Sequence, residues 1–363
     1  MESTMKLLFE KSIPGRRTKY LSKCDVPIRT LPAGMERVLP PRFPELVETN
    51  ISRHYSALES RTFGVNDGFY PLGSCTMKYD PKINEKVSAL AGFTELHPLQ
   101  PLDGVQVILE ALYLSEQYLT EITGMDKMSF QPSAGAHGEF VGLLLIKKYH
   151  ENRDDTARTK VIVPDSAHGT NPATVSICGM SVVKVASNAD GCKDSFGNVL
   201  GFYGNILVVL RALAYIMTLS SDGLPEMSKH AVLNANYLKH LLSVHFEIVN
   251  KGLCMHEFIV TMEKEAKEKN VTAKDMPKAL LDNSMMSPTM YFPLIVKEAL
   301  MVEPTETEGK ETLDYVVETY IRLYEEVMAN PEAAHLLPKN TIIGRPDEVE
   351  AARNPIVCYK WEA

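Results

Sequence analysis

The sequence predicts an α/β fold, with a mainly parallel sheet in a large domain and an α+β small domain after it. Between residues 127 and 186, short apolar runs of strand length alternate with helical patterns, as in βαβ units. After Gly191 the alternation stops, and long helical patterns follow before short strands resume. The 363 residues are 45% hydrophobic and 23% charged, so the chain is globular and long enough for a large core.

The sequence predicts an arm without regular structure first and then a domain in which helices and strands alternate. Residues 1–60 hold six prolines and little periodicity, so we expect an extended N-terminal arm. The large domain is expected over residues 61–201, truncated after about residue 191. Within it we predict helices at 101–123 (stopped by Gly124), at 137–150 and from Pro172, and strands at 127–130, 160–164 and 181–186.

Residues 202–363 are expected to form a helical connection and a C-terminal α+β small domain. The helical patterns run over 202–220 and 224–243. Beyond them the sequence predicts strands at 246–249, 258–262 and 294–295, and helices at 273–282 and 312–329.

Charge and cysteine usage exclude several classes of protein. The net charge is −8, and Lys and Arg are scattered among the acids, which argues against a nucleic-acid or membrane-surface protein. No secretory signal is visible, and the longest apolar stretch, 206–219, contains Arg211 and falls short of the ~20 residues of a membrane span. Six widely spaced cysteines without a CxxC pair are typical of reduced thiols, so we expect a cytoplasmic protein.

Two loops of the predicted sheet could meet one ligand. Ser133, Ala134, Gly135 and Ala136 form a small-residue turn before a helix, where backbone N–H groups can bind an anion such as a phosphate. His168 follows the next strand, 33 residues after Gly135, which is about one βαβ unit. Small turns are also common without a ligand, and an imidazole can stack on a flat ring, exchange protons or simply hold its loop.

A third segment, residues 70–79, contains the hydroxyl, thiol and ammonium groups of Ser74, Cys75, Thr76 and Lys78. A nucleophilic cysteine needs a lowered pKa and a nearby base, so a free thiol in a polar loop is the simpler account of Cys75. Metal-ligand residue types also occur at 137–139 and 254–257, but neither segment has HExxH or paired CxxC spacing. We therefore predict no metal site.

Taken together, these segments resemble one family, the pyridoxal phosphate (PLP)-dependent glycine dehydrogenase (decarboxylating), the P-protein of the glycine cleavage system. The resemblance is closest to the separate second subunit of its two-subunit versions. The motifs that carry it are spread in family order over nearly the whole chain: residues 9–17, 71–79, 97–101, 131–139, 166–172, 202–205, 254–258, 303–308 and 352–355.

The resemblance implies a fold-type I PLP enzyme that decarboxylates glycine oxidatively and passes the aminomethyl group to the lipoyl arm of the H-protein. It also implies a hetero-oligomer with a first subunit. By the same resemblance, Ser133–Ala136 hold the cofactor phosphate, His168 stacks on the pyridine ring and Thr170 lies at the cofactor. Ser74, Cys75, Thr76 and Lys78 are candidates for the rim of the substrate site.

The sequence departs from the family at the reacting end of the site. The family lysine that bonds PLP, in an Asn-Leu-His-Lys-Thr-Phe type of motif, and the aspartate that pairs with the pyridine nitrogen are not found. Both belong between Gly191 and Phe202, so roughly three or more βα units of about 30 residues each are missing there. Lys184 and Lys193 lie nearby in sequence but match no motif. A second departure is at residues 282–289, where the family has Asp-Tyr-Gly-Phe-His before Pro-Thr.

We therefore expect a P-protein second subunit by descent that is inactive alone, because it lacks the lysine and aspartate on which the electron sink depends. Two alternatives are a non-catalytic subunit that binds the family's partners and a defective product of an internally deleted gene. Loss of central strands would leave sheet edges unpaired.

Overall fold

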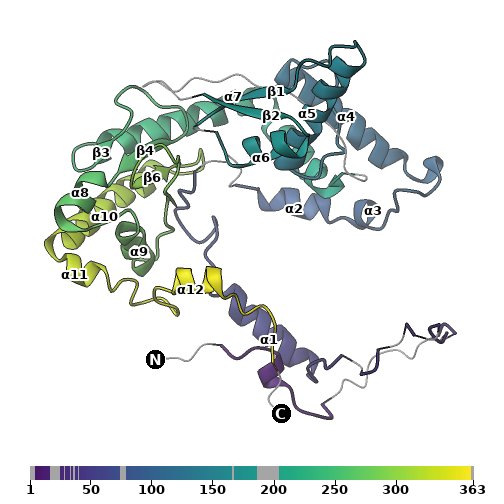
Figure 1. Cartoon of the computed structure of the whole chain (residues 1–363), viewed down its shortest axis with the longest axis horizontal. Helices are drawn as coiled ribbons and strands as arrows, with labels where there is room; N and C mark the ends of the chain where they lie inside the picture. The colour runs from purple at the N-terminus through teal and green to yellow at the C-terminus, as the bar shows by residue number, and fades with distance from the viewer. Residues whose placement is uncertain are drawn as a thin grey trace.

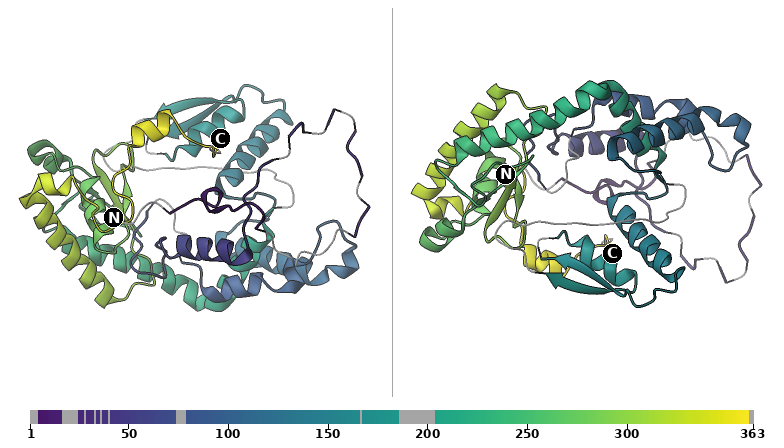
Figure 2. Two further views of the ribbon diagram at one scale, coloured as in Figure 1. Left: turned by 90° about the horizontal axis from the view of Figure 1, so that it is seen from below. Right: turned by 90° about the horizontal axis from the view of Figure 1, so that it is seen from above.

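The computed structural model describes residues 5–16, 25–27, 29–32, 34–35, 37–39, 41–73, 79–165, 167–185 and 204–360. Figures 1 and 2 show these parts from three directions. The predictions on Ser74, Cys75, Thr76, Lys78 and Lys193 fall outside the described residues.

A parallel β–α–β unit forms the best-defined part of the large domain, as predicted. Strand β1 (Lys160–Pro164) pairs with β2 (Ser181–Val185) in register from Lys160 opposite Ser181 to Pro164 opposite Val185. Helix α5 (Gly135–Glu151) precedes β1, and α6 (Thr170–Ile177) connects the two strands. Both helices cover one face of the strands through a small core of Leu143, Val163, Val175 and Cys178.

The other face of this two-stranded sheet has no such cover in the described part of the chain. Ile162 is 71% exposed, and Val183 and Val185 lie exposed on the same face. Parallel strands are normally buried on both faces. The exposed face is therefore what we expect if the helices that would cover this side of the sheet are missing. The strand predicted at 127–130 is wrong, because the segment is irregular there and pairs with neither described strand. Helix α6 begins at Thr170, two residues before the predicted Pro172.

A layer of helices precedes and follows this unit. It contains α2 (Lys82–Ser88), α3 (Ala91–Thr94), the 3₁₀ turn η2 (Leu102–Gly104) and α4 (Gln106–Thr123). Helix α4 ends at Gly124, whose φ of 67° places it in the left-handed conformation that favours glycine at this position. Leu210 and Leu213 of α7 (Ile206–Leu242) pack against Ala111 of α4.

Helix α7 consists of two helices joined across a kink, which correspond to those predicted at 202–220 and 224–243, and the first begins at Ile206. Its backbone leaves helical geometry at Ser220 (φ 59°, ψ −173°), just before Pro225, whose ring cannot donate a hydrogen bond to the preceding turn. At 37 residues α7 is long and apolar enough to cross a membrane by length and composition, whereas the sequence alone predicted a shorter stretch. Of its apolar 18-residue window 11% is buried inside the protein, and one such helix is weak support for a membrane span.

The C-terminal region is an α+β unit around an antiparallel sheet with the order β3-β4-β6-β5. Its strands are β3 (Glu247–Ile248), β4 (Phe258–Thr261), β5 (Thr289–Met290) and β6 (Ala299–Val302). Its helices are α8 (Glu263–Lys269), α9 (Asp275–Asp282), α10 (Lys310–Ala329), α11 (Pro331–Ala334) and α12 (Glu348–Arg353). The largest core joins the end of α7 to this sheet and to α9 and α10.

The strand predicted at 294–295 is wrong, because these residues lie in the loop between β5 and β6. The sheet uses Ala299–Val302 instead, and all four of these residues are buried.

The N-terminal arm differs from the extended segment expected over residues 1–60. It contains the 3₁₀ turn η1 (Phe9–Lys11) and helix α1 (Glu48–Glu59). The Phe9 ring stacks on Tyr359 near the other end of the chain, with ring centroids 4.8 Å apart.

Candidate functional site

The predicted phosphate turn lies at the N-terminus of helix α5. Ser133, Ala134, Gly135 and Ala136 are all exposed, and Ala134 is the N-cap residue in an extended conformation. The Ser133 N–H donates to Nδ1 of His137 over 3.2 Å. Because the side chains here are small and exposed, an anion can approach the N–H groups of the first turn of α5. The geometry thus suits a phosphate.

His168 is exposed in the loop between β1 and α6. Its Nδ1 atom lies 3.0 Å from Thr170 Oγ1 and 3.3 Å from the Thr170 N atom, and the tautomer of the ring decides which of these two contacts is a hydrogen bond. Its ring centroid is 6.1 Å from that of Phe292, with the two planes at 62°. Phe292 lies in the β5–β6 loop, so this contact brings the C-terminal region to the edge of the large-domain loop.

Glu139 joins the phosphate turn to the His168 loop. From α5, its Oε2 accepts from Thr170 Oγ1 over 2.9 Å, and its Oε1 accepts from Asn171 Nδ2 over 2.6 Å. In the sequence, Glu139 is part of the 131–139 motif and of the metal-ligand residue types at 137–139, and neither pattern predicts this role. The spacing of one βα unit between Glu139 and Asn171 could have suggested it, because consecutive parallel units lie side by side.

The segment that leads into residues 74–78 is attached to the edge of the small sheet. Leu72 forms a bridge with Val302, and the Glu303 N–H donates to Pro71 O over 3.1 Å. The Gly73 N–H donates to Thr289 Oγ1 over 3.0 Å. Ser74, Cys75, Thr76 and Lys78 follow directly, outside the described residues, so their place at a substrate rim stays a prediction.

One imidazole and two carboxylates gather beside this attachment. Potential ligand atoms of His256, Glu257 and Glu303 lie within 4.8 Å of one another, and Glu303 is buried. These are ligand types that metal ions use, so the three residues form a candidate cation site; acidic groups are also common without an ion. His256 and Glu257 belong to the 254–257 segment, where the sequence predicted no metal site because the ligand residues lack a known metal-binding spacing.

The acidic motif at residues 303–308 is held by helix α7. Asn234 Nδ2 donates to the carbonyl oxygens of Thr305 (2.9 Å) and Glu308 (3.0 Å). Burial raises the pKa of the Glu308 carboxyl above its usual value. Burial, together with the nearby Glu306 carboxylate, raises the pKa of Tyr215 to about 12. The Tyr215 hydroxyl therefore stays protonated around neutral pH.

The family departure at residues 282–289 has a structural consequence. Ser284 stands where the family has glycine, and its φ is 56°, in the left-handed region that glycine enters without strain. The serine costs about 1 kcal/mol there. Met285 replaces the family's phenylalanine and is buried, so the apolar character of that position is kept.

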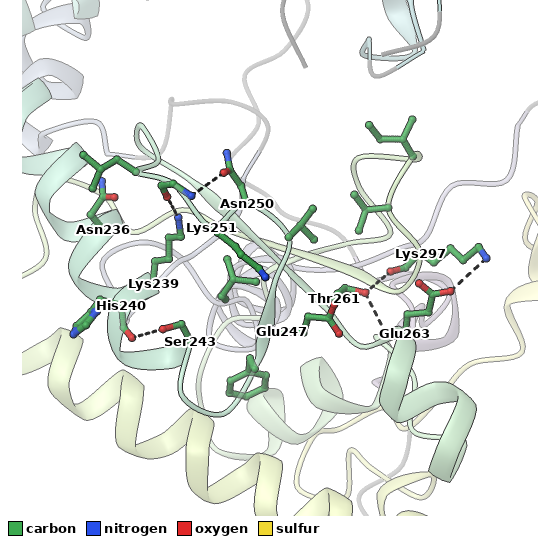
Figure 3. A pocket seen from close by; sticks show the side chains of 17 residues that line it. Asn236, Lys239, His240, Ser243, Glu247, Asn250, Lys251, Thr261, Glu263 and Lys297 are labelled. Carbon is green, nitrogen blue, oxygen red and sulfur yellow. Dashed lines mark hydrogen bonds and ion pairs between the residues drawn. The ribbon is translucent and has the colours of Figure 1, made fainter. Parts of the chain in front are cut away.

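None of these site residues lines the cavity of about 1170 Å³ that Figure 3 shows. It is bounded by the end of α7, the edge of β3 and the 295–297 loop, and Lys239 Nζ donates to the Gly252 carbonyl at its wall. Lys297 pairs with Glu263 over 3.3 Å at the opposite side. No predicted site residue lines this cavity, so its size does not make it the site of the family's chemistry.

Comparison with known proteins identifies the family. The family model described as "Glycine dehydrogenase, C-terminal domain" matches residues 227–346. A protein of Treponema denticola named "Probable glycine dehydrogenase (decarboxylating) subunit 2" is 39% identical, over 98% of this chain and 98% of its own length. This chain belongs to the glycine dehydrogenase (decarboxylating) subunit 2 family. The resemblance seen in the sequence is confirmed, and the family is one of oxidoreductases.

Solved structures confirm the fold class of this family member. A glycine decarboxylase (P-protein) of the glycine cleavage system superposes with a TM-score of 0.65 at 13% identity, covering 80% of this chain and 92% of that one. Serine palmitoyltransferase with a PLP internal aldimine superposes with a TM-score of 0.50 at 11% identity, covering 77% and 98%. The chain thus has the α/β architecture of PLP enzymes of fold type I.

The aligned lengths also show that relatives contain residues that this chain lacks. A Listeria monocytogenes relative of the same name is 37% identical over 486 aligned positions that span 100% of this chain and 99% of the relative. Since this chain has 363 residues, at least 486 − 363 = 123 positions place a relative's residue opposite a gap. That number agrees with the three or more βα units predicted to be missing.

The residues present fit one end of a PLP molecule and not the other. The exposed turn at Ser133–Ala136 suits the phosphate, and the exposed His168 ring suits the pyridine. The lysine motif that would bond the cofactor is not in the sequence, and neither is the aspartate motif for the ring nitrogen. We therefore derive no chemical step through the cofactor in this chain.

Proposed function

We propose that this chain is a second subunit of the glycine cleavage P-protein by descent that no longer catalyses the family's reaction alone. In the complete enzyme, the reaction would be the PLP-dependent oxidative decarboxylation of glycine with transfer of the aminomethyl group to the lipoyl group of the H-protein. PLP supplies the electron sink for such a step. The proposal rests on the internal gap of at least 123 aligned positions together with the missing lysine motif.

The surfaces that survive support a second candidate, a non-catalytic subunit that binds the first P-protein subunit and the lipoylated H-protein. Helix α1 exposes Ile51, Tyr55 and Leu58 at positions i, i+4 and i+7. An amphipathic helix normally covers such a stripe. Pull-down of the first subunit or the H-protein without turnover would favour this candidate, and aggregation of the isolated chain would favour a defective gene product.

The proposal includes three further expectations. We propose that Ser133–Ala136, His168 and Thr170 bind a phosphorylated pyridine without a covalent bond, and that residues 74–78 form the substrate rim. We propose the division into an arm (1–60), a truncated large domain (61–201) and a helical connection with a small domain (202–363). A cytoplasmic location is proposed as well, in line with Cys178, Cys254 and Cys358, which are free thiols.

A borohydride experiment tests the proposal directly. The purified 363-residue chain is incubated with PLP, reduced with borohydride and mapped by mass spectrometry, with the Treponema denticola relative treated in parallel. We expect no stoichiometric pyridoxyl-lysine in this chain, because the bonding lysine is absent. One lysine labelled in equal amount to the protein would refute the proposal.

An intact mass separates the two origins of the gap. A mass near 40.5 kDa, with coding DNA continuous across codons 191 to 202, means a genuine deletion. A mass that is larger by the weight of about 100 or more residues means that the natural protein carries the missing segment. Catalytic activity is then expected.

A further inference from the structure

We propose that Glu139 is a positioning residue, which fixes His168 through Thr170 and thereby sets the imidazole relative to the turn at Ser133–Ala136. The inference rests on the proposed function for the nature of the ligand, a phosphorylated pyridine. The arrangement of Glu139, Thr170 and His168 itself is present without any ligand.

The first step is the use of both carboxylate oxygens of Glu139. Oε2 accepts from the Thr170 hydroxyl over 2.9 Å and Oε1 accepts from the Asn171 side-chain amide over 2.6 Å. Both partners are in the first turn of α6, whereas Glu139 is in α5. One half-buried side chain therefore ties together the two helices that begin at the candidate site.

The second step is the orientation of His168. The single hydroxyl hydrogen of Thr170 goes to Glu139, so Oγ1 is left as an acceptor that faces Nδ1 at 3.0 Å. In the tautomer that fits this oxygen, Nδ1 carries the proton and donates it to Oγ1, and the hydroxyl donates in turn to Glu139. Phe292 contacts the ring from another direction. The ring is thus held although it is exposed.

The third step connects this ring to the phosphate turn. Gly135 is the first residue of α5 and Glu139 lies one helical turn later, so the carboxylate moves with the N–H groups of the turn. A ligand that spans the turn and the ring needs a fixed separation between them. Glu139 accepts two hydrogen bonds, from the side chains of Thr170 and Asn171, that tie α5 to the residues just after His168. The Glu139 carboxylate therefore helps to set that separation.

The variants E139Q and T170V break this chain of contacts at two points. A Gln side chain has a single acceptor oxygen at its end, so it satisfies only one of the two donors. Valine at position 170 keeps the volume and the backbone N–H but removes the hydroxyl that links His168 to Glu139. E151Q is the matched control, because Glu151 ends the same helix and pairs with the exposed Lys148, away from the site.

The test uses the full chain labelled with ¹⁵N-histidine, and H168Q assigns the His168 signals. Without ligand, we expect the His168 ring signals to shift in E139Q and T170V and to stay in place in E151Q. The probe ligand is pyridoxamine 5′-phosphate, which carries no aldehyde and needs no lysine. We expect both variants to bind it about tenfold more weakly, which corresponds to about one hydrogen bond.

The outcomes separate this inference from the proposed function. His168 signals that coincide with wild type in both variants would overturn the role of Glu139, as would unchanged affinity for the probe. A loss of thermal stability alone, with unchanged His168 signals, would mean a purely structural clamp and would also overturn it. If the wild-type chain does not bind the probe, the proposed cofactor site fails, while the ligand-free His168 signals still decide the role of Glu139.

Discussion

Gly204 is the position where a single methyl group should have the largest effect on the candidate site. Its φ is 71°, and a Cβ atom there would lie 1.8 Å from Phe130 O and 2.9 Å from Phe130 C. Both are backbone atoms, so no side-chain rotation relieves the contact. Phe130 lies three residues before the phosphate turn, so the clash would push the approach to Ser133 out of place.

We predict that G204A destabilises the fold by about 2–4 kcal/mol. Left-handed strain of an alanine contributes about 1 kcal/mol, and forced movement of the 130–131 backbone contributes about 1–3 kcal/mol. G124A is the matched control, because Gly124 has a φ of 67° and a Cβ atom added there would have no other atom within 4 Å. It should lose only the strain, about 1 kcal/mol.

Urea unfolding followed by far-ultraviolet circular dichroism measures both variants against wild type. G204A should unfold at a clearly lower urea concentration than G124A, and it should also bind pyridoxamine 5′-phosphate more weakly. Equal stability of the two variants, within about 0.5 kcal/mol, would refute the reasoning, since it would mean that the close approach of Gly204 to Phe130 contributes nothing.

Three further predictions follow from other parts of the chain. Burial disfavours the charge of Asp275, but hydrogen bonds from Thr272 and Arg345 outweigh it and hold the pKa of Asp275 below its usual value. The lowered pKa contributes to the free energy of unfolding above about pH 4, and this contribution is lost as the pH falls through the folded-state pKa. We therefore expect D275N to reduce the free energy of unfolding by about 2 kcal/mol at pH 7 and by less at pH 3, as measured by urea titration. On β1, V163A should reduce the free energy of unfolding by about 2 kcal/mol, because Val163 is buried. I162K, on the exposed face, should reduce it by under about 0.5 kcal/mol and should lower self-association in light scattering. Equal losses of stability would contradict the view that this face of the sheet has lost its covering layer. Y320F should raise stability by about 1 kcal/mol in thermal unfolding, because the buried Tyr320 hydroxyl has no hydrogen-bond partner in the described structure; a loss of that size would reveal a partner.

The sequence predicted the parts of the fold that local pattern determines. The strand at 160–164 is confirmed to the residue, because an apolar run between a polar loop and a helix signal has few alternatives. The run at 127–130 has the same local character and forms no strand. A strand needs a neighbour, and the 127–130 segment pairs with neither β1 nor β2, the two strands described in this sheet.

The candidate site was predictable only in part for a related reason. Motif resemblance located His168 and the 133–136 turn, and the structure places both at the starts of neighbouring helices. The motif resemblance could not show that Glu139 bridges the turn and the His168 loop. A carboxylate on a helix is usually solvated, and its hydrogen-bond partners depend on how the two loops meet. Pairing of Leu72 with Val302 is a contact over 230 residues, which no local pattern encodes.

Helix α7 has a mechanical consequence for the molecule. Its first half packs against α2 and α4, and its second half contributes Leu238 and Leu242 to the C-terminal core. At about 1.5 Å per residue, α7 extends over some tens of ångströms. Because its backbone leaves helical geometry at Ser220, its two halves are separate straight segments, and the connection between the two cores depends on this one residue.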